Sequence, residues 1–304
     1  MAKQGIIDIE NINQEFEKLK LRLHLLSDRF LAVAMDYKHY IDGSFKEDKI
    51  YQLRDNVQYR LFSARVHLEL LLRQHKFIES RMESKYKEDP SMITGNYFPI
   101  NPYFDHYQKE ISSIFDSVVY HLSSVFDYIS TLTNYISGPN KEDTLMWTQL
   151  AKSVRDNHNN FSKRKFALAI DDIDREFVNK LYDHRAFIIH KSADPSGYNV
   201  TLFVGSEERI EANFLAGKNL VKNFKELKTL SKEKHPTVKY VAFWILNMTI
   251  DKVTEILFSL KLEMESNPKV NIPSMFYLHP ETKKPMPVST AYWHEDLYLK
   301  DKSG

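Results

Sequence analysis

One segment of the sequence combines residue types that could carry chemistry: Arg185 and His190, in the run from Leu181 to Lys191. On a helix, Arg185 shares a face with Leu181 and Ile188, so its guanidinium starts from a packed surface. A charge placed there needs a partner or a ligand, because unpaired burial is costly. His190 follows about 140° further round the helix. A long arginine side chain can reach toward it, so both groups could edge one cleft.

The position of His190 at a helix end suits an acid–base role. Ala193, Asp194 and Pro195 follow it and stop the helix. The negative end of a helix dipole stabilises a cationic side chain, which is useful for a general acid near neutral pH.

Arg185, four intervening residues and His190 resemble the Arg-x4-His motif of the HEPN superfamily of helical domains, over about residues 104–262. Many members of that superfamily are metal-independent ribonucleases, in which the Arg and His of two subunits meet across a dimer interface. The resemblance implies that His190 acts as acid or base on the RNA 2′-hydroxyl and the leaving oxygen, and that Arg185 stabilises the charge developing on phosphorus. The products would carry a 2′,3′-cyclic phosphate.

The residues around the motif extend the resemblance and also depart from it. Active members of the superfamily usually have a polar residue directly after the arginine, where this chain has Ala186. Asp183 and His184, on the other side of the arginine, are candidates for that role, and Lys191 adds a supporting positive charge. The family's spacing also fits Arg60 and His67, but that pair lacks the stop that follows His190.

Three functions remain open at this stage. The first is a HEPN-like endoribonuclease that works as a homodimer. The second is a non-catalytic module of the same fold that binds RNA, a nucleotide or a protein. The third is an interaction scaffold, in which the N-terminal helical hairpin and the third helix mediate oligomerisation.

Other catalytic signatures are absent from the sequence. It has no Gly-rich phosphate loop, no Gly-x-Ser-x-Gly and no His-Glu-x-x-His. With no cysteine, disulfides, thiol catalysis and thiolate metal sites are excluded. Asp171, Asp172 and Asp174 are interpreted as caps at the start of a helix rather than as a metal cluster. We expect no metal and no cofactor.

Charge and hydropathy limit the kinds of partner that the protein can bind. A net charge of +1 is unlike the strong basic excess of a dedicated duplex-DNA binder, but a local patch could hold a single strand. No run of the sequence approaches the roughly 18 uncharged apolar residues of a membrane span. The N-terminus does not resemble a secretory signal. We therefore expect a cytoplasmic protein that binds no membrane.

The motif must be positioned by long helices, which apolar residues three and four apart predict. We expect an all-α fold, a bundle of five or more long helices. The first three apolar stripes run through Ile12, Phe16, Leu19, Leu23, Leu26, Phe30, Val33 and Tyr37; through Ile50, Leu53, Val57, Leu61, Ala64, Leu68, Leu71, Ile78 and Met82; and through Tyr107, Ile111, Ile114, Val118, His121, Val125, Tyr128, Leu132 and Tyr135.

The rest of the chain predicts shorter elements. Further helices are expected at 141–156, 171–190 and 236–264, and alternating apolar residues predict a small β-hairpin insertion near 198–214. We divide the chain into an N-terminal helical hairpin (1–90), a HEPN-like bundle with the β-hairpin (104–264) and an irregular C-terminal tail (265–304), which together form one unit.

Overall fold

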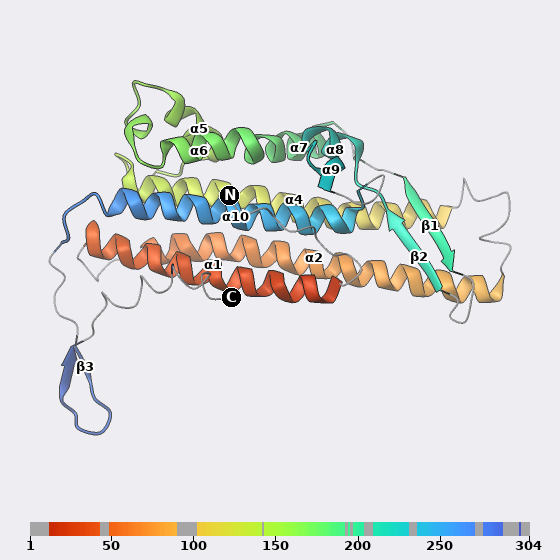
Figure 1. The fold of residues 1–304 in the computed structure, drawn as a ribbon, viewed down its shortest axis with the longest axis horizontal. Coiled ribbons are helices and arrows are strands. Elements are labelled where there is room, and N and C mark those ends of the chain that lie inside the picture. The colour runs from red at the N-terminus through yellow and green to blue at the C-terminus, as the bar shows by residue number, and fades with distance from the viewer. Residues whose placement is uncertain are drawn as a thin grey trace. The chain divides into compact units, whose positions relative to one another are not determined.

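The computed structural model describes residues 12–42, 49–89, 102–141, 143–191, 194, 197–203, 209–230, 236–270, 276–287 and 298 (Figure 1). The predicted fold class is confirmed: the protein is all-α with a small β-hairpin insertion. The α-helices are α1 (Ile12–Tyr40), α2 (Lys49–Glu88), α4 (Pro102–Ser137), α5 (Trp147–Arg155), α6 (Ala167–Ile173), α7 (Asn179–His190), α8 (Lys218–Asn223), α9 (Leu227–Leu230) and α10 (Val238–Met264).

The predicted apolar stripes explain why the long helices form. On α2 every residue of the stripe from Ile50 to Met82 is buried. On α1 the buried members are Leu19, Leu26, Phe30, Val33 and Tyr37, which recur in steps of three, four or seven. Since most helical stability in proteins comes from packing an apolar face, these stripes determine which side of each helix faces inward.

The chain forms two compact units, and the border between them falls inside α1, α2, α4 and α10. Unit 1 comprises residues 1–15, 62–123 and 179–247, and unit 2 comprises residues 16–61, 124–178 and 248–304. The division into a hairpin, a bundle and a tail that the sequence suggested stays a prediction.

Unit 2 packs parts of α1, α2, α4 and α10 together with α5 and α6. Arg29 on α1 donates to the Thr254 hydroxyl on α10 at 3.1 Å, and Gln58 on α2 donates to Ser27 on α1 at 3.0 Å. A four-residue 3₁₀-helix (Asn160–Lys163) joins α5 to α6, and a π-helical segment, η4 (Asp174–Val178), follows α6.

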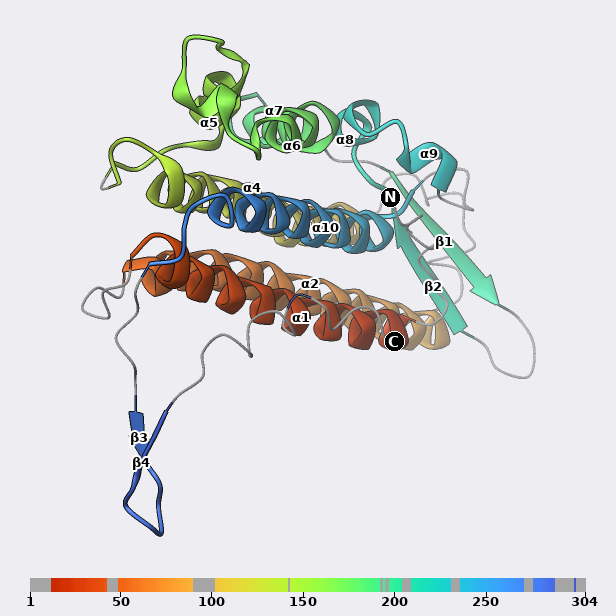
Figure 2. The same cartoon turned by 60° about the vertical axis from the view of Figure 1, so that its left-hand side comes forward.

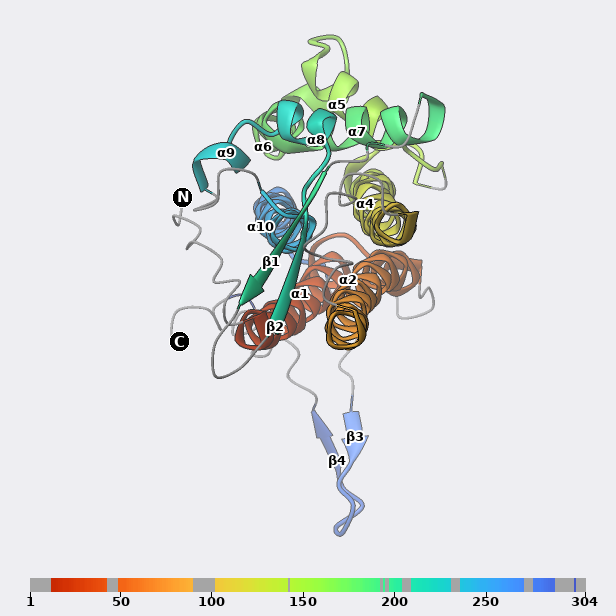
Figure 3. The same ribbon diagram turned by 90° about the vertical axis from the view of Figure 1, so that its right-hand side faces the viewer.

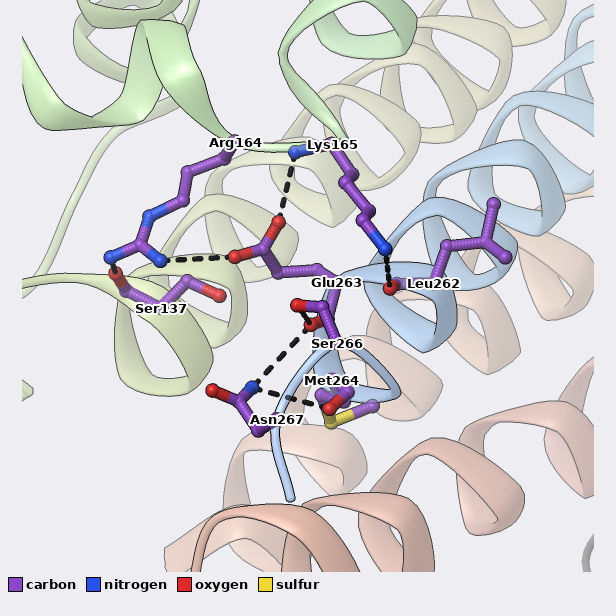
Figure 4. Close-up of polar contacts among 8 residues, drawn as sticks. All are labelled: Ser137, Arg164, Lys165, Leu262, Glu263, Met264, Ser266 and Asn267. Carbon is purple, nitrogen blue, oxygen red and sulfur yellow. Dashed lines mark hydrogen bonds and ion pairs between the residues drawn. The ribbon is translucent and has the colours of Figure 1, made fainter.

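The buried carboxylate of Glu263 ties the connection before α6 to the end of α10 (Figure 4). Its Oε1 lies 3.0 Å from Nη1 of Arg164, and its Oε2 accepts the backbone N–H of Lys165 at 2.8 Å. Arg164 also donates to the carbonyl oxygen of Ser137 at 3.2 Å. One carboxylate therefore neutralises a cation and satisfies a backbone donor, which is what a buried charge requires.

Unit 1 contains the rest of α2 and α4, the first part of α10, α7, α8, α9 and the β-hairpin. The hairpin consists of β1 (Tyr198–Phe203) and β2 (Arg209–Phe214), which lie side by side in antiparallel register, with Tyr198 opposite Phe214 and Phe203 opposite Arg209 (Figure 2). The predicted hairpin at 198–214 is confirmed. On α10 every side chain from Tyr240 to Asn247 is buried, so this part of the helix is covered on all sides.

The prediction that the aspartates at 171–174 cap the start of a helix is wrong. The helix begins earlier, at Ala167, because apolar residues there extend its buried face. Asp174 is buried in the π-helical segment, where it accepts a hydrogen bond from the Trp147 indole at 2.7 Å and one from Arg155 at 2.5 Å. Asp171 pairs with Arg155. These carboxylates hold α5 against the following helix.

The C-terminal segment, predicted to be irregular, contains a second antiparallel pair of strands, β3 (Phe276–Leu278) and β4 (Pro285–Pro287). The two prolines of β4 hide the strand pattern in the sequence, because proline lacks the N–H of a regular ladder. Residues 90–101, between α2 and α4, lie outside the described residues.

We expect Glu263→Ala to lower the free energy of unfolding by about 1–3 kcal/mol, because it leaves the Lys165 N–H without its acceptor and Arg164 without its carboxylate. Urea unfolding of the purified protein measures this.

Glu255→Ala on the same helix is the matched control. Glu255 is about half exposed and lies 3.2 Å from Lys252, which keeps a second partner in Glu176. Exposed pairs contribute roughly 0–1 kcal/mol, so equal effects of the two variants would contradict the role assigned to Glu263.

Candidate functional site

Helix α7 carries the predicted motif, and two inward-facing side chains hold it in unit 1. Leu181 and His184 are buried. Tyr182 lies against α4, where its hydroxyl donates to the carbonyl oxygen of Ser123 at 3.1 Å. The predicted helix at 171–190 is thus a core element whose end, at His190, agrees with the stop expected from the sequence.

Arg185 lies half-buried against two aromatic rings. Its guanidinium carbon is 5.2 Å from the ring centroid of Tyr120 on α4 and 5.8 Å from that of Tyr182. Cation–π contacts of this length restrict the direction of a guanidinium. Tyr120 is itself 42% exposed, so this stack lies at the surface of unit 1. The packed environment predicted for Arg185 is therefore present.

His190 is the last residue of α7 and is exposed, as is the neighbouring Lys191. The Lys191 N–H still donates to the carbonyl oxygen of Phe187 at 2.9 Å, which completes the final turn. The two cation–π contacts of Arg185 are with Tyr120 and Tyr182. The structure thus presents an exposed imidazole and an aromatic-supported guanidinium on the same helix, five residues apart.

The candidate supporting residues divide between surface and interior. Asp183 and Ala186 are exposed, whereas His184 is 1% exposed. Neither ring nitrogen of His184 has a hydrogen-bond partner among the described residues. Burial lowers the pKa of His184 to about 4, against the opposing charge of Asp194. We therefore assign His184 no direct part in surface chemistry at neutral pH.

Asp116 and Asp194 form a titratable cluster with His184 that the sequence analysis missed. Burial, with a smaller contribution from the charge of Asp194, raises the pKa of Asp116 on α4 to about 6. The Asp194 carboxylate accepts the backbone N–H groups of Asn219 at 3.2 Å and Leu220 at 3.0 Å. No motif signals the cluster, because its members come from three separate parts of the chain.

The second Arg/His pair of the sequence has a local structural role. Nδ1 of His67 lies 2.8 Å from the carbonyl oxygen of Ser63, and the His67 ring lies 4.9 Å from that of His121 on α4. This pairing explains the place of His121 on the apolar stripe of its helix.

Neither a metal site nor a membrane span is found in the part of the chain that the structure describes. Within it, no three His, Asp or Glu side chains come together in a way that could hold a metal ion. None of the helices there has the length and apolar character needed to cross a bilayer. Comparison with protein-family models, curated proteins and solved structures found no match.

The cluster leads to an expectation for Asp116→Asn. The folded-state pKa of Asp116, about 6, exceeds its ordinary value of 3.8, so the folded protein holds this proton where the unfolded chain has lost it. Stability therefore falls as the pH rises from 3.8 through 6. Above pH 6 the neutral variant should gain about 1–3 kcal/mol relative to the wild type, and this gain should vanish below pH 3.8. Thermal unfolding across pH measures it.

His184→Leu is a control, because the effect of His184 on stability has the opposite pH dependence. With a folded-state pKa of about 4 against 6.5 in the unfolded chain, His184 destabilises the wild type as the pH falls from 6.5 to 4. The leucine variant should lack that loss. Parallel pH profiles for the wild type and both variants would contradict the cluster.

Proposed function

We propose that the chain is a HEPN-like, metal-independent endoribonuclease in which Arg185 and His190 act on the scissile phosphate. The observation that carries the proposal is the stacking of Arg185 on the Tyr120 and Tyr182 rings, on the helix that ends in the exposed His190. A guanidinium held by aromatic rings is pre-oriented, so less side-chain entropy is lost when it binds a phosphate.

The reaction needs a base and an acid. One imidazole takes the proton of the RNA 2′-hydroxyl, whose oxygen then attacks phosphorus. A second gives a proton to the 5′-oxygen as its bond to phosphorus breaks, which leaves a 2′,3′-cyclic phosphate. Arg185 stabilises the negative charge on the phosphate oxygens during this exchange. No step requires a metal ion.

Two protein copies would supply both imidazoles. His190 is the final residue of α7, and each chain provides one such residue at this position. A homodimer that places two α7 ends on one RNA strand would contain two His190 and two Arg185 side chains. We therefore propose a homodimeric enzyme that acts on RNA in the cytoplasm.

The second candidate is a non-catalytic module of the same kind that binds RNA, a nucleotide or a protein. The surroundings of Arg185 favour it, since the residue that follows the arginine is the exposed Ala186 and His184 faces the interior. Binding would still use Arg185 and Lys191 on phosphates or carboxylates, because exposed cations suffice for affinity.

We expect His190→Ala and Arg185→Ala each to lower the rate of RNA cleavage in EDTA by about 10²–10⁴-fold, the usual range for a general acid or base. The measurement is the appearance of 2′,3′-cyclic phosphate ends on single-stranded and hairpin RNAs, alongside RNA affinity.

His158→Ala and Arg65→Ala are the matched controls. His158 is exposed. Arg65 is on α2 rather than α7, and its guanidinium carbon lies 5.0 Å from the ring centroid of Phe62. Both should cleave like the wild type. Absence of wild-type cleavage on every RNA, with binding retained and lost in Arg185→Ala, would establish the binding module instead.

The stack itself is tested at Tyr120. Tyr120→Phe keeps the ring that faces Arg185, whereas Tyr120→Leu removes it. If the ring positions the guanidinium, Tyr120→Leu should lower kcat by about tenfold, a cost typical of one cation–π contact, and Tyr120→Phe should restore it. Loss of activity in both variants would point to the hydroxyl rather than to the ring.

A further inference from the structure

The two outer edges of the β-hairpin differ in their backbone partners. Along β2, the N–H of Ile210 donates to Glu83 at 3.2 Å and that of Ala212 donates to Glu79 at 3.2 Å, both on α2. Just beyond β2, the N–H of Ala216 donates to the carbonyl oxygen of Pro236 at 2.8 Å. Two outward N–H groups of β2 are therefore satisfied by α2.

The register shows which backbone groups of β1 point away from the hairpin. Because Ile210 and Ala212 direct their N–H groups outward, the alternate residues of β2 must bond β1. Leu215, just beyond β2, continues this alternation, since its N–H donates to the carbonyl oxygen of Gly197 at 2.9 Å. Val200 and Leu202 lie opposite Ala212 and Ile210, so their N–H and C=O groups face the outer edge of β1.

Within unit 1, no described helix or strand lies along that outer edge. In Figures 1 and 3, β2 flanks β1 on one side, and no other described element of unit 1 follows its other side. Natural proteins usually protect such an edge with a charge, a proline or a bulge. The strand reads Tyr-Asn-Val-Thr-Leu-Phe, pairs without a bulge and contains none of these features.

We propose that the outer edge of β1 pairs with β1 of a second copy of this chain. The two strands run antiparallel about a two-fold axis at Val200. The Val200 N–H donates to the Val200 carbonyl of the other copy, and the N–H of Leu202 donates to the carbonyl of Tyr198. The two hairpins then form one four-stranded antiparallel sheet, a form of strand addition.

Charge and side-chain pairing favour a second copy over a different occupant. An isologous contact places like charges near one another, and β1 contains no charged residue, so no repulsion opposes it. In this register Tyr198 faces Leu202 of the other copy on the half-buried face, and Asn199 faces Thr201 on the exposed face. Aromatic–aliphatic and polar pairs of this kind stabilise antiparallel strands.

The size of the contact sets its strength. A pair of six-residue strands buries less than the roughly 1,200 Å² typical of stable complexes. We therefore expect dissociation constants on the order of micromolar or weaker. This edge is separate from the residues assigned to cleavage, and the proposal stands or falls independently of nuclease activity.

The test follows individual backbone amides as the protein concentration rises to about 1 mM. Sedimentation should show a monomer–dimer equilibrium, and hydrogen exchange at Val200 and Leu202 should slow as the dimer forms. The Thr201 amide, which bonds β2, should exchange slowly at every concentration. A monomer throughout, or a dimer in which Val200 and Leu202 exchange as in the monomer, would overturn the proposal.

Val200→Pro removes an outward N–H that the hairpin does not use, and Val200→Ala is the control that keeps it. Loss of two symmetry-related hydrogen bonds should raise the dimer Kd by about tenfold to a hundredfold in the proline variant, with little change in the alanine variant. Slow exchange at Thr201 verifies that the hairpin has folded.

Thr201→Lys is a second variant, for use if the proline variant does not fold. It adds a charge to the exposed face of β1 opposite Glu211, which the hairpin tolerates, and should also weaken the dimer. Undiminished dimerisation of a folded Val200→Pro or Thr201→Lys protein would refute the pairing.

Discussion

The complete burial of α10 from Tyr240 to Asn247 is the constraint on which unit 1 depends. A helix that is apolar all round cannot face water on any side, so every neighbour must cover part of it. The buried run from Tyr240 to Asn247 includes Trp244, whose ring packs edge-on against Phe224 at 5.2 Å. Phe224 ends the short helix α8, which begins where Asp194 accepts two backbone N–H groups. The packing that buries this part of α10 thus extends from the core to Asp194, in the segment that follows the candidate site.

The long helices and the β-hairpin were predictable because each has a simple period. Buried residues on α2 recur in steps of three and four from Ile50 to Met82, and β1 alternates half-buried with exposed side chains. These periods follow from the geometry of one element alone. The boundaries were less predictable, since the π-helical turn at Asp174 depends on partners far away in the sequence, Trp147 and Arg155.

The candidate site was predictable only in part, because its contacts also depend on residues far away in the sequence. The half-buried place of Arg185 followed from its helical face, but its support by Tyr120 comes from a different helix. His184 illustrates the opposite case. It is adjacent to Arg185 in the sequence, and only packing determines that it turns inward toward the charge of Asp194. A single sequence shows which residues share a face of a helix. It does not show which residue of another element packs against each of them.

The two glutamates that bind β2 have a geometric consequence. Glu79 and Glu83 are one helical turn apart, a rise of roughly 6 Å, and Ala212 and Ile210 are two strand residues apart, roughly 6.7 Å. Because these two lengths are nearly equal, α2 presents side-chain acceptors at the spacing of a β-ladder. It takes the place of a third strand that would run antiparallel to β2. An insertion of one residue between the two glutamates would turn one carboxylate away by about 100° and disrupt the match. The four-residue spacing of this pair is therefore as much a condition of the hairpin as the strands themselves.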